Sequence, residues 1–202
     1  MGFFGKRDKK IGGKIGYYGL SEWWLATFTE EERRYIEQTY QPIGGGQNNI
    51  TSGQILNISG SVCSFLAALS SWFNKANDRY LALKMQETSE QVQGSTLDRH
   101  FLYLQMIKTY YKDRDTVPGS LDKAIESCEK QISIAPQAAN AFKKDWGDNA
   151  LPAHTGYKQL AIIRDKQGEY AEAITLCQKA KAQGWMGDWD KRIAKYQNKL
   201  DK

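Results

Sequence analysis

Few residues of this sequence combine the type and the spacing that catalysis or phosphate binding requires. The chain of 202 residues has two histidines, His100 and His154, and neither has a candidate acid–base or nucleophilic partner nearby in the sequence. We therefore expect both histidines to lie on the surface or to cap helices. The glycines at 44–46 lack the following Lys-Ser/Thr of a phosphate-binding loop. The sequence predicts no enzymatic activity and no cofactor, although side chains distant in sequence can also assemble an active site.

The three cysteines predict packed thiols rather than a metal centre. Cys63, Cys128 and Cys177 are far apart in the sequence, whereas a metal site needs clustered ligands. The odd number of cysteines, and the absence of an apolar leader over residues 1–20, predict the reducing cytoplasm as the compartment. No window approaches the run of about 20 apolar residues that spans a bilayer, so no membrane partner is expected.

Two features near residue 30 have competing interpretations. The pair Trp23-Trp24 is suited either to stacking on bases or a ligand, or to fastening a helix to the core, and we favour the core. The consecutive carboxylates Glu30–Glu32 resemble metal ligands, but neighbouring residues on a helix point in different directions. Because Thr29 and Glu32 have the spacing of a capping box, we interpret the acidic run as the first turn of a helix.

The elements that would position any site are helical, since the apolar residues recur with a helical period and no stretch alternates convincingly enough for a sheet. We expect a mobile basic tail over residues 1–16. An N-terminal helical region follows over residues 17–94, interrupted by a Gly-rich loop at 42–53.

Within residues 17–94 and after them, the helical spacing of apolar residues indicates individual helices. A helical pattern covers residues 54–73 and continues over 74–93. Ser95 with Asp98 has the spacing that begins the next helix, and a final helix is expected over residues 189–200.

Two segments in the second half of the chain share the residue spacing of one helical hairpin. Its clearer copy, at residues 154–183, combines large side chains on one helix with small ones on the next: Tyr157, Leu160, Ala161, Gly168, Tyr170, Ala173, Cys177 and Ala180. Gly168 supplies a permissive backbone at the turn, and Ala173 lets the two helices approach closely. The earlier copy shares part of the pattern: Tyr103, Met106, Ile107, Tyr110, Ala124, Cys128 and Pro136. Residues 137–151 are interpreted as a short added helix.

These spacings resemble the tetratricopeptide repeat, a pair of antiparallel helices of about 34 residues. The resemblance covers about residues 97–185, with Arg164 in place of the usual Tyr and Trp185 in place of the closing Pro. It implies an all-α protein of stacked helical hairpins, an α-solenoid, whose repeat region with a capping helix spans residues 95–202. The whole chain also resembles small bacterial or phage-borne proteins that have a Trp-rich N-terminal region before such repeats.

Proteins of this family usually bind partners through the concave face formed by the first helices of the repeats. By this resemblance, seven residues would face the groove: Lys108, Tyr111, Lys112, Lys158, Ile162, Asp165 and Lys166. A basic groove with one aromatic residue suits an acidic protein or peptide. The same lysines also fit a merely solvated helix face, and both interpretations stay open.

The net charge of +5 is concentrated at the two ends of the sequence. Residues 1–14 contain five basic residues and one acidic residue, and residues 143–202 contain 12 basic and 8 acidic residues. The first interpretation is a non-catalytic, cytoplasmic interaction protein that binds a protein or peptide. The alternative is a binder of anionic small molecules or of nucleic acid, which a steep salt dependence of the affinity would reveal.

Overall fold

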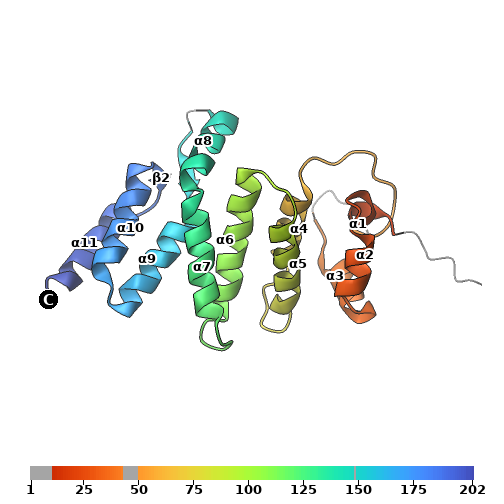
Figure 1. The fold of residues 1–202 in the computed structure, drawn as a ribbon, viewed down its shortest axis with the longest axis horizontal. Helices are drawn as coiled ribbons and strands as arrows, with labels where there is room; N and C mark the ends of the chain where they lie inside the picture. The colour runs from red at the N-terminus through yellow and green to blue at the C-terminus, as the bar shows by residue number, and fades with distance from the viewer. Residues whose placement is uncertain (1–10, 43–49, 148) are drawn as a thin grey trace, which may run out of the picture. The chain divides into compact units, whose positions relative to one another are not determined.

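The computed structural model describes residues 11–42, 50–147 and 149–202, which form eleven helices and one two-stranded sheet. The chain is mostly helical, so the all-α class expected from the sequence is confirmed (Figure 1). It divides into two compact units, residues 1–60 and residues 61–202. None of the helices in the described ranges has both the length and the apolar character that crossing a membrane requires.

The first unit contains three short helices, α1 (Gly13–Tyr17), α2 (Ser21–Thr27) and α3 (Glu30–Thr39). α3 begins with the expected capping box, because the Thr29 amide donates to the Glu32 carboxylate (2.8 Å) and the Glu32 amide donates to Thr29 Oγ1 (3.2 Å). Trp24 is 1% exposed, which confirms its place in the core. Trp23 is half-buried, with its ring edge-to-face against Phe28.

Residues 11–16 are packed into this unit, so the prediction of a mobile tail is wrong for that part of residues 1–16. Ile15 is fully buried, and its amide donates to the carbonyl of Ile50 at 2.9 Å. Residues 50–53 form turns and bends, in agreement with the predicted loop, and Ile50 is buried in the unit. Residues 1–10 of the predicted tail and residues 43–49 of the predicted loop lie outside the described residues.

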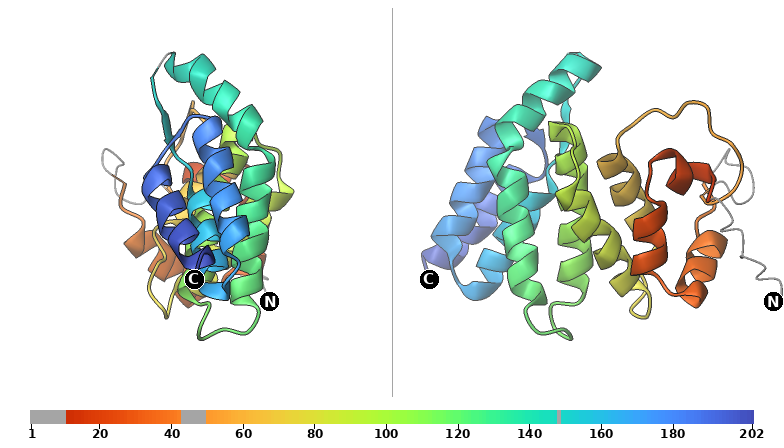
Figure 2. Two further views of the ribbon diagram at one scale, coloured as in Figure 1. Left: turned by 90° about the vertical axis from the view of Figure 1, so that its left-hand side faces the viewer. Right: turned by 45° about the vertical axis from the view of Figure 1, so that its right-hand side comes forward.

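The second unit contains three helical hairpins, one inserted helix and a last helix (Figures 1 and 2). Its helices are α4 (Val62–Ser70), α5 (Arg79–Gln91), α6 (Thr96–Lys112), α7 (Ser120–Ser133), α8 (Ala135–Trp146), α9 (Thr155–Gln167), α10 (Tyr170–Ala182) and α11 (Trp189–Leu200). The hairpins are α4–α5, α6–α7 and α9–α10, and α11 packs on α10. Successive hairpins are neighbours, since α4 packs on α6 and both α6 and α7 pack on α9.

Several helix boundaries agree with the sequence analysis, and others differ: α5 covers only Arg79–Gln91 of the pattern at 74–93, and the added helix expected over 137–151 is α8, Ala135–Trp146. Ser95 and Asp98 form the capping box of α6, and α11 has the expected bounds. The pattern at 54–73 predicted a helix that starts too early, because α4 begins only at Val62. Gly60 has a φ of +104°, which interrupts any helix there, and Ser61 caps α4 with its side chain.

The hairpin α4–α5 belongs to the same unit as the later hairpins, whereas the sequence analysis placed the start of the hairpin region at residue 95. A buried polar contact joins its helices to α6. The side-chain amide of Gln86 on α5 donates to Ser70 Oγ (3.2 Å) on α4 and to Thr109 Oγ1 (2.9 Å) on α6. Such buried hydrogen bonds are costly to break, so they fix these three helices to one another.

The small residues that were expected at the crossings of the hairpins are buried. Ala124, Ala161 and Ala173 are fully buried, and Ala161 and Ala173 lie in one continuous core. Gly168 has a φ of +80° at the end of α9, a backbone conformation that suits glycine at the α9–α10 turn. The predicted packing of the cysteines is also confirmed, because all three thiols are free and buried.

Ala173→Trp tests the crossing of α9 and α10. The substitution adds a large side chain at a site with no exposed surface, so we expect a loss of about 1–3 kcal/mol in the free energy of unfolding. Chemical denaturation of the full chain measures this loss. A variant as stable as the wild type would contradict the packing described for α10.

A small parallel sheet is the feature that the sequence analysis did not anticipate. β1 (Leu151–Ala153) precedes α9 and pairs with β2 (Trp185–Met186), which follows α10. Trp185, at the position of the closing Pro in the repeat pattern, is 2% exposed. Its large ring fills the space beside the sheet, and its indole Nε1 donates to Gln183 Oε1 at 2.9 Å.

The two histidines meet in an aromatic cluster beside this sheet. His100 is 1% exposed and stacks on Trp185 with ring centroids 5.6 Å apart, so the prediction of a surface or capping role is wrong for His100. His154 is also buried, but it does cap α9, because its Nδ1 accepts a hydrogen bond from the Tyr157 amide at 3.2 Å. The two imidazole centroids are 5.2 Å apart, and Phe142 closes the cluster from α8.

Both imidazoles are held neutral by this environment. Burial lowers the pKa of His100 to about 4. Burial and the neighbouring His100 lower the pKa of His154 to about 3. His100 Nδ1 and His154 Nε2 have no hydrogen-bond partner in the described part of the chain. Backbone hydrogen bonds favour a proton on His154, but they do not offset the effect of burial and of His100.

Candidate functional site

The lysines predicted to face a groove lie on two neighbouring helices. Lys108, Lys112 and Lys166 lie toward the C-terminal ends of α6 and α9, whereas Lys158 lies at the opposite, N-terminal end of α9. Lys108 and Lys112 are one turn apart on α6, and both are exposed. Lys158 and Lys166 are exposed on α9, which packs on α6. We call Lys108, Tyr111, Lys112, Lys158 and Lys166 the basic face.

Tyr111 connects the two helices of the basic face. The Lys166 ammonium from α9 lies 5.7 Å from the centroid of the Tyr111 ring on α6, within the range of a cation–π contact. Arg114 lies over the same ring at 4.3 Å, and its Nη1 donates to the Tyr111 carbonyl at 2.8 Å. The ring is thus held between two cations, one from each of two hairpins.

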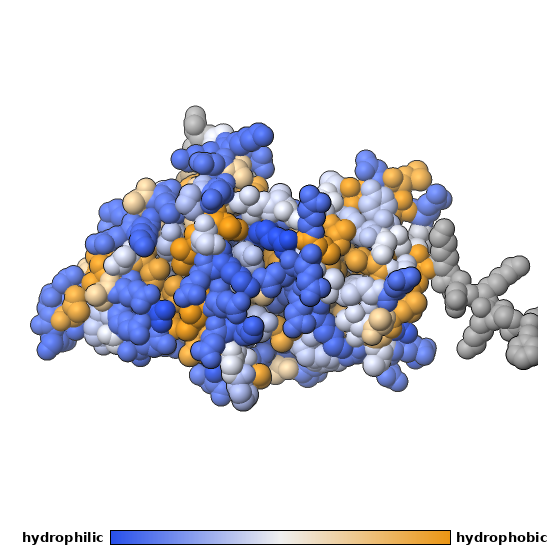
Figure 3. All heavy atoms as spheres, viewed as in Figure 1, coloured by the Kyte–Doolittle hydropathy of each residue, from blue (hydrophilic) through white to orange (hydrophobic). Residues whose placement is uncertain are grey.

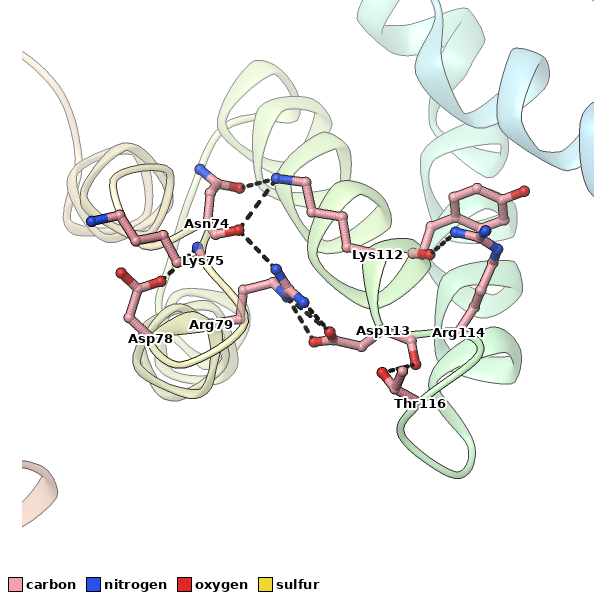
Figure 4. A network of polar contacts seen from close by, with 9 residues as sticks. Asn74, Lys75, Asp78, Arg79, Lys112, Asp113, Arg114 and Thr116 are labelled. Atoms are coloured by element: carbon pink, nitrogen blue, oxygen red, sulfur yellow. Dashed lines mark hydrogen bonds and ion pairs between the residues drawn. The ribbon is translucent and has the colours of Figure 1, made fainter.

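Lys112 is tied to the α4–α5 turn by neutral oxygens. Its Nζ donates to Asn74 Oδ1 at 3.0 Å, and Figure 4 shows Asn74 lying between Lys112 and Arg79. Arg79 donates to the Asn74 carbonyl at 2.8 Å and forms a bidentate ion pair with Asp113, its Nε lying 2.9 Å from both carboxylate oxygens. These amide oxygens are neutral, so Lys112 has no carboxylate partner in the described part of the chain.

Asp165 is occupied by an intramolecular contact. Its carboxylate accepts hydrogen bonds from Lys195 (2.8 Å) and Lys199, both on α11. Although burial opposes it, these two lysines lower the pKa of the Asp165 carboxyl. Asp165 therefore joins α9 to α11 and is not free to contact a partner, in contrast to its place in the predicted groove.

Three carboxylates near residues of the basic face, Asp113, Asp115 and Asp188, pair with arginines and not with its lysines. Asp113 pairs with Arg79, and Asp115 pairs with Arg114 at 2.8 Å. Asp188, whose pKa is lowered mainly by its hydrogen bond with Arg192 and slightly by Lys158, is likewise engaged. Within the described ranges, Lys108, Lys158 and Lys166 form no ion pair. The basic face consequently carries uncompensated positive charge.

The side chains of this arrangement can bind anions. Its groups are ammonium ions, a guanidinium and a phenol ring, which attract carboxylates or phosphates. The described residues contain no group of three or more histidine, cysteine, aspartate or glutamate side chains placed to hold a metal ion. On the face of the second unit seen in Figure 3, polar side chains cover most of the surface and apolar residues appear in small groups.

Four contributors to this site were missed by the sequence analysis: Asn74, Arg114, Lys195 and Lys199. Arg114 follows Tyr111 by three residues, so local spacing could have indicated it. The other three come from the α4–α5 turn and from α11, and only the packing of the hairpins brings them near the predicted residues.

Comparisons with known protein families, with curated proteins and with solved structures found no match to this chain. The function proposed below is therefore argued from the arrangement of this chain's own residues.

Proposed function

We propose that this protein is a non-catalytic interaction protein of the tetratricopeptide type, which binds an acidic protein or peptide through the basic face. The observation that supports the proposal best is the Lys166 ammonium beside the Tyr111 ring, together with the exposed Lys108 one turn before Tyr111 on α6; neither lysine forms an ion pair in the described part of the chain. Carboxylates of a partner would supply the ion pairs that the chain itself does not make there. The partner's backbone or apolar groups would contact the exposed part of Tyr111.

The order of packing supports the tetratricopeptide part of the proposal. Three hairpins follow one another, the first helices α4, α6 and α9 are neighbours in that order, and α11 covers the last hairpin. The small residues at the crossings agree with the repeat spacings. The helix α8 and the β1–β2 sheet are additions between and after the repeats, and they account for the spacing of the two copies.

The alternative is a binder of anionic small molecules or of nucleic acid. Phosphates are attracted by the same lysines, and the Tyr111 ring could stack on a base. Both candidates share the basic face, so an experiment must compare the two kinds of anion on one set of variants.

We expect the double variant Lys108→Glu with Lys166→Glu to bind an acidic peptide at least about 30-fold more weakly than the wild type, because two attractions become two repulsions. The probe is a fluorescent poly-L-glutamate peptide, titrated at constant ionic strength and followed by anisotropy. Circular dichroism should show unchanged helical content, since both side chains are exposed.

A matched control separates this effect from the change in net charge. Lys143→Glu with Lys179→Glu alters the same number of exposed lysines on α8 and α10, and it should bind nearly as well as the wild type. Equal losses in the two double variants would contradict a defined basic face. Tighter binding of a single-stranded oligonucleotide of equal charge, with a steep salt dependence, would favour the alternative.

A further inference from the structure

A pocket in the first unit is independent of the basic face and of the function proposed for it. Its volume is about 600 Å³, and it is bordered by α2, α3 and the packed segments 11–12 and 51–53. This volume lies in the range of small-molecule sites, about 300–1,000 Å³. We call it the α2–α3 pocket, defined by Trp24, Leu25, Arg33, Glu37 and Thr51.

The rim of the α2–α3 pocket is fixed by backbone contacts. The amides of Gly12 and Gly13 donate to the carbonyls of Thr51 and Gly53, both at 2.9 Å. A Cβ atom on Gly12 would lie only 2.6 Å from the Gly53 carbonyl oxygen, so this close approach requires glycine. The two segments therefore form a defined edge on one side of the pocket.

Arg33 places a cation in the pocket wall. Its Nη1 donates to the Phe28 carbonyl and to the Leu25 carbonyl, the latter at 3.3 Å, which holds the guanidinium beside the end of α2. Neutral carbonyls leave its charge uncompensated, and no carboxylate among the described residues pairs with it. The remaining N–H groups of Arg33 match the geometry with which arginine binds a carboxylate.

Glu37 places an anion in the same wall. It lies one turn after Arg33 on α3, so the two side chains start about 5–6 Å apart. Glu37 Oε1 accepts a hydrogen bond from Thr51 Oγ1 at 2.7 Å, which directs the carboxylate toward the rim and away from an ion pair with Arg33. The other carboxylate oxygen has no hydrogen-bond partner in the described part of the chain.

An unpaired cation and an unpaired anion in one pocket are complementary to a ligand that carries both charges. We propose that the α2–α3 pocket binds a small zwitterion with an apolar substituent, of which a free α-amino acid is the simplest. The ligand carboxylate pairs with Arg33, and the ligand ammonium pairs with Glu37. Trp24 forms an apolar part of the pocket lining, and Leu25, which is 55% exposed, offers an apolar contact for the substituent.

Three probes separate the two charges in a calorimetric titration of the full-length protein. L-leucine carries both charges, N-acetyl-L-leucine only the carboxylate, and L-leucinamide only the ammonium. We expect saturable binding of L-leucine, and at least about tenfold weaker binding of each derivative, because one charged hydrogen-bonded contact is lost in each case.

Variants of α3 test the two assigned residues. Glu37→Gln removes the charge but keeps an acceptor for Thr51. Arg33→Gln removes the cation, and Arg33→Lys, which keeps it, is used if Arg33→Gln fails to fold. We expect Glu37→Gln and Arg33→Gln to weaken L-leucine binding at least about tenfold. The matched controls Glu31→Gln and Arg34→Gln change exposed residues of the same helix and should bind as the wild type does.

Three results would overturn the proposal. The first is no saturable heat with L-leucine at about 10 mM, and the second is equal affinity for L-leucine and its two derivatives. The third is an equal loss of binding in the control variants. None of these results bears on the basic face, which lies on α6 and α9, so the two proposals stand or fail separately.

Discussion

Lowering the pH from 7 to 5 is expected to reduce the free energy of unfolding by about 4 kcal/mol. The cause is the pair of buried imidazoles, whose pKa values are about 4 for His100 and about 3 for His154 in the folded chain. Both values lie below the ordinary histidine pKa of 6.5. At pH 5 the unfolded chain therefore binds two protons that the folded chain excludes. Each proton stabilises the unfolded state relative to the folded state by about 2 kcal/mol.

The direction of this effect follows from the lowered pKa values. Stability falls as the pH drops below 6.5 and continues to fall until the folded pKa values are reached. Two other titratable groups of the same core, Tyr157 and Cys128, do not interfere, because burial raises the pKa of Tyr157 and raises the pKa of the Cys128 thiol to about 12. Urea denaturation of the full chain at several pH values measures the slope.

A double variant isolates the histidines in this experiment. His100→Phe keeps an aromatic ring on Trp185, and His154→Asn keeps a side-chain acceptor at the start of α9. We expect this variant to lose most of the change in stability between pH 7 and 5, whatever its absolute stability. An unchanged slope would show that other groups titrate in this range and would contradict the assignment.

The second large effect is expected at the ion pair between α5 and the end of α6. Arg79 and Asp113 have side chains that are only 12% and 15% exposed (Figure 4). Asp113→Ala leaves the Arg79 guanidinium largely buried without its carboxylate, so we expect a loss of about 3 kcal/mol in the free energy of unfolding. Chemical denaturation at neutral pH measures this loss.

Two comparisons make the prediction for Asp113 specific. Asp115 pairs with Arg114 but is 72% exposed, so Asp115→Ala should cost less than about 1 kcal/mol. The double variant Arg79→Met with Asp113→Ala removes the buried charge and should recover part of the stability lost in the single variant. Equal stabilities of the single and double variants would contradict a penalty from unpaired charge.

The parts of the fold that the sequence predicted depend on neighbouring residues. The capping boxes of α3 and α6 are contacts between residues three apart, and the small residues at the hairpin crossings follow helical spacing. The parts that were missed depend on distant residues. Ile15 is buried because its segment pairs with Ile50, and β1 is a strand only because β2 lies beside it after a whole hairpin.

The same distinction applies to the candidate sites. Exposure of Lys108, Lys112, Lys158 and Lys166 follows from helical spacing, whereas the role of Asp165 depends on two lysines of α11. The four-residue spacing of Arg33 and Glu37 was visible in the sequence, but that spacing usually indicates a surface ion pair. Only the hydrogen bonds to the Leu25 carbonyl and to Thr51 distinguish the pocket residues from such a pair.

The β1–β2 pairing gives the α9–α10 hairpin a topology that the other two hairpins do not share in the described part of the chain. The chain enters α9 through Leu151–Ala153 and leaves α10 through Trp185–Met186, and these segments are hydrogen-bonded to each other. The hairpin is thus a closed loop of chain, fastened at its base. Fluctuations that separate α9 from α10 leave this base intact, so the ends of the loop stay together and reclosure costs little chain entropy.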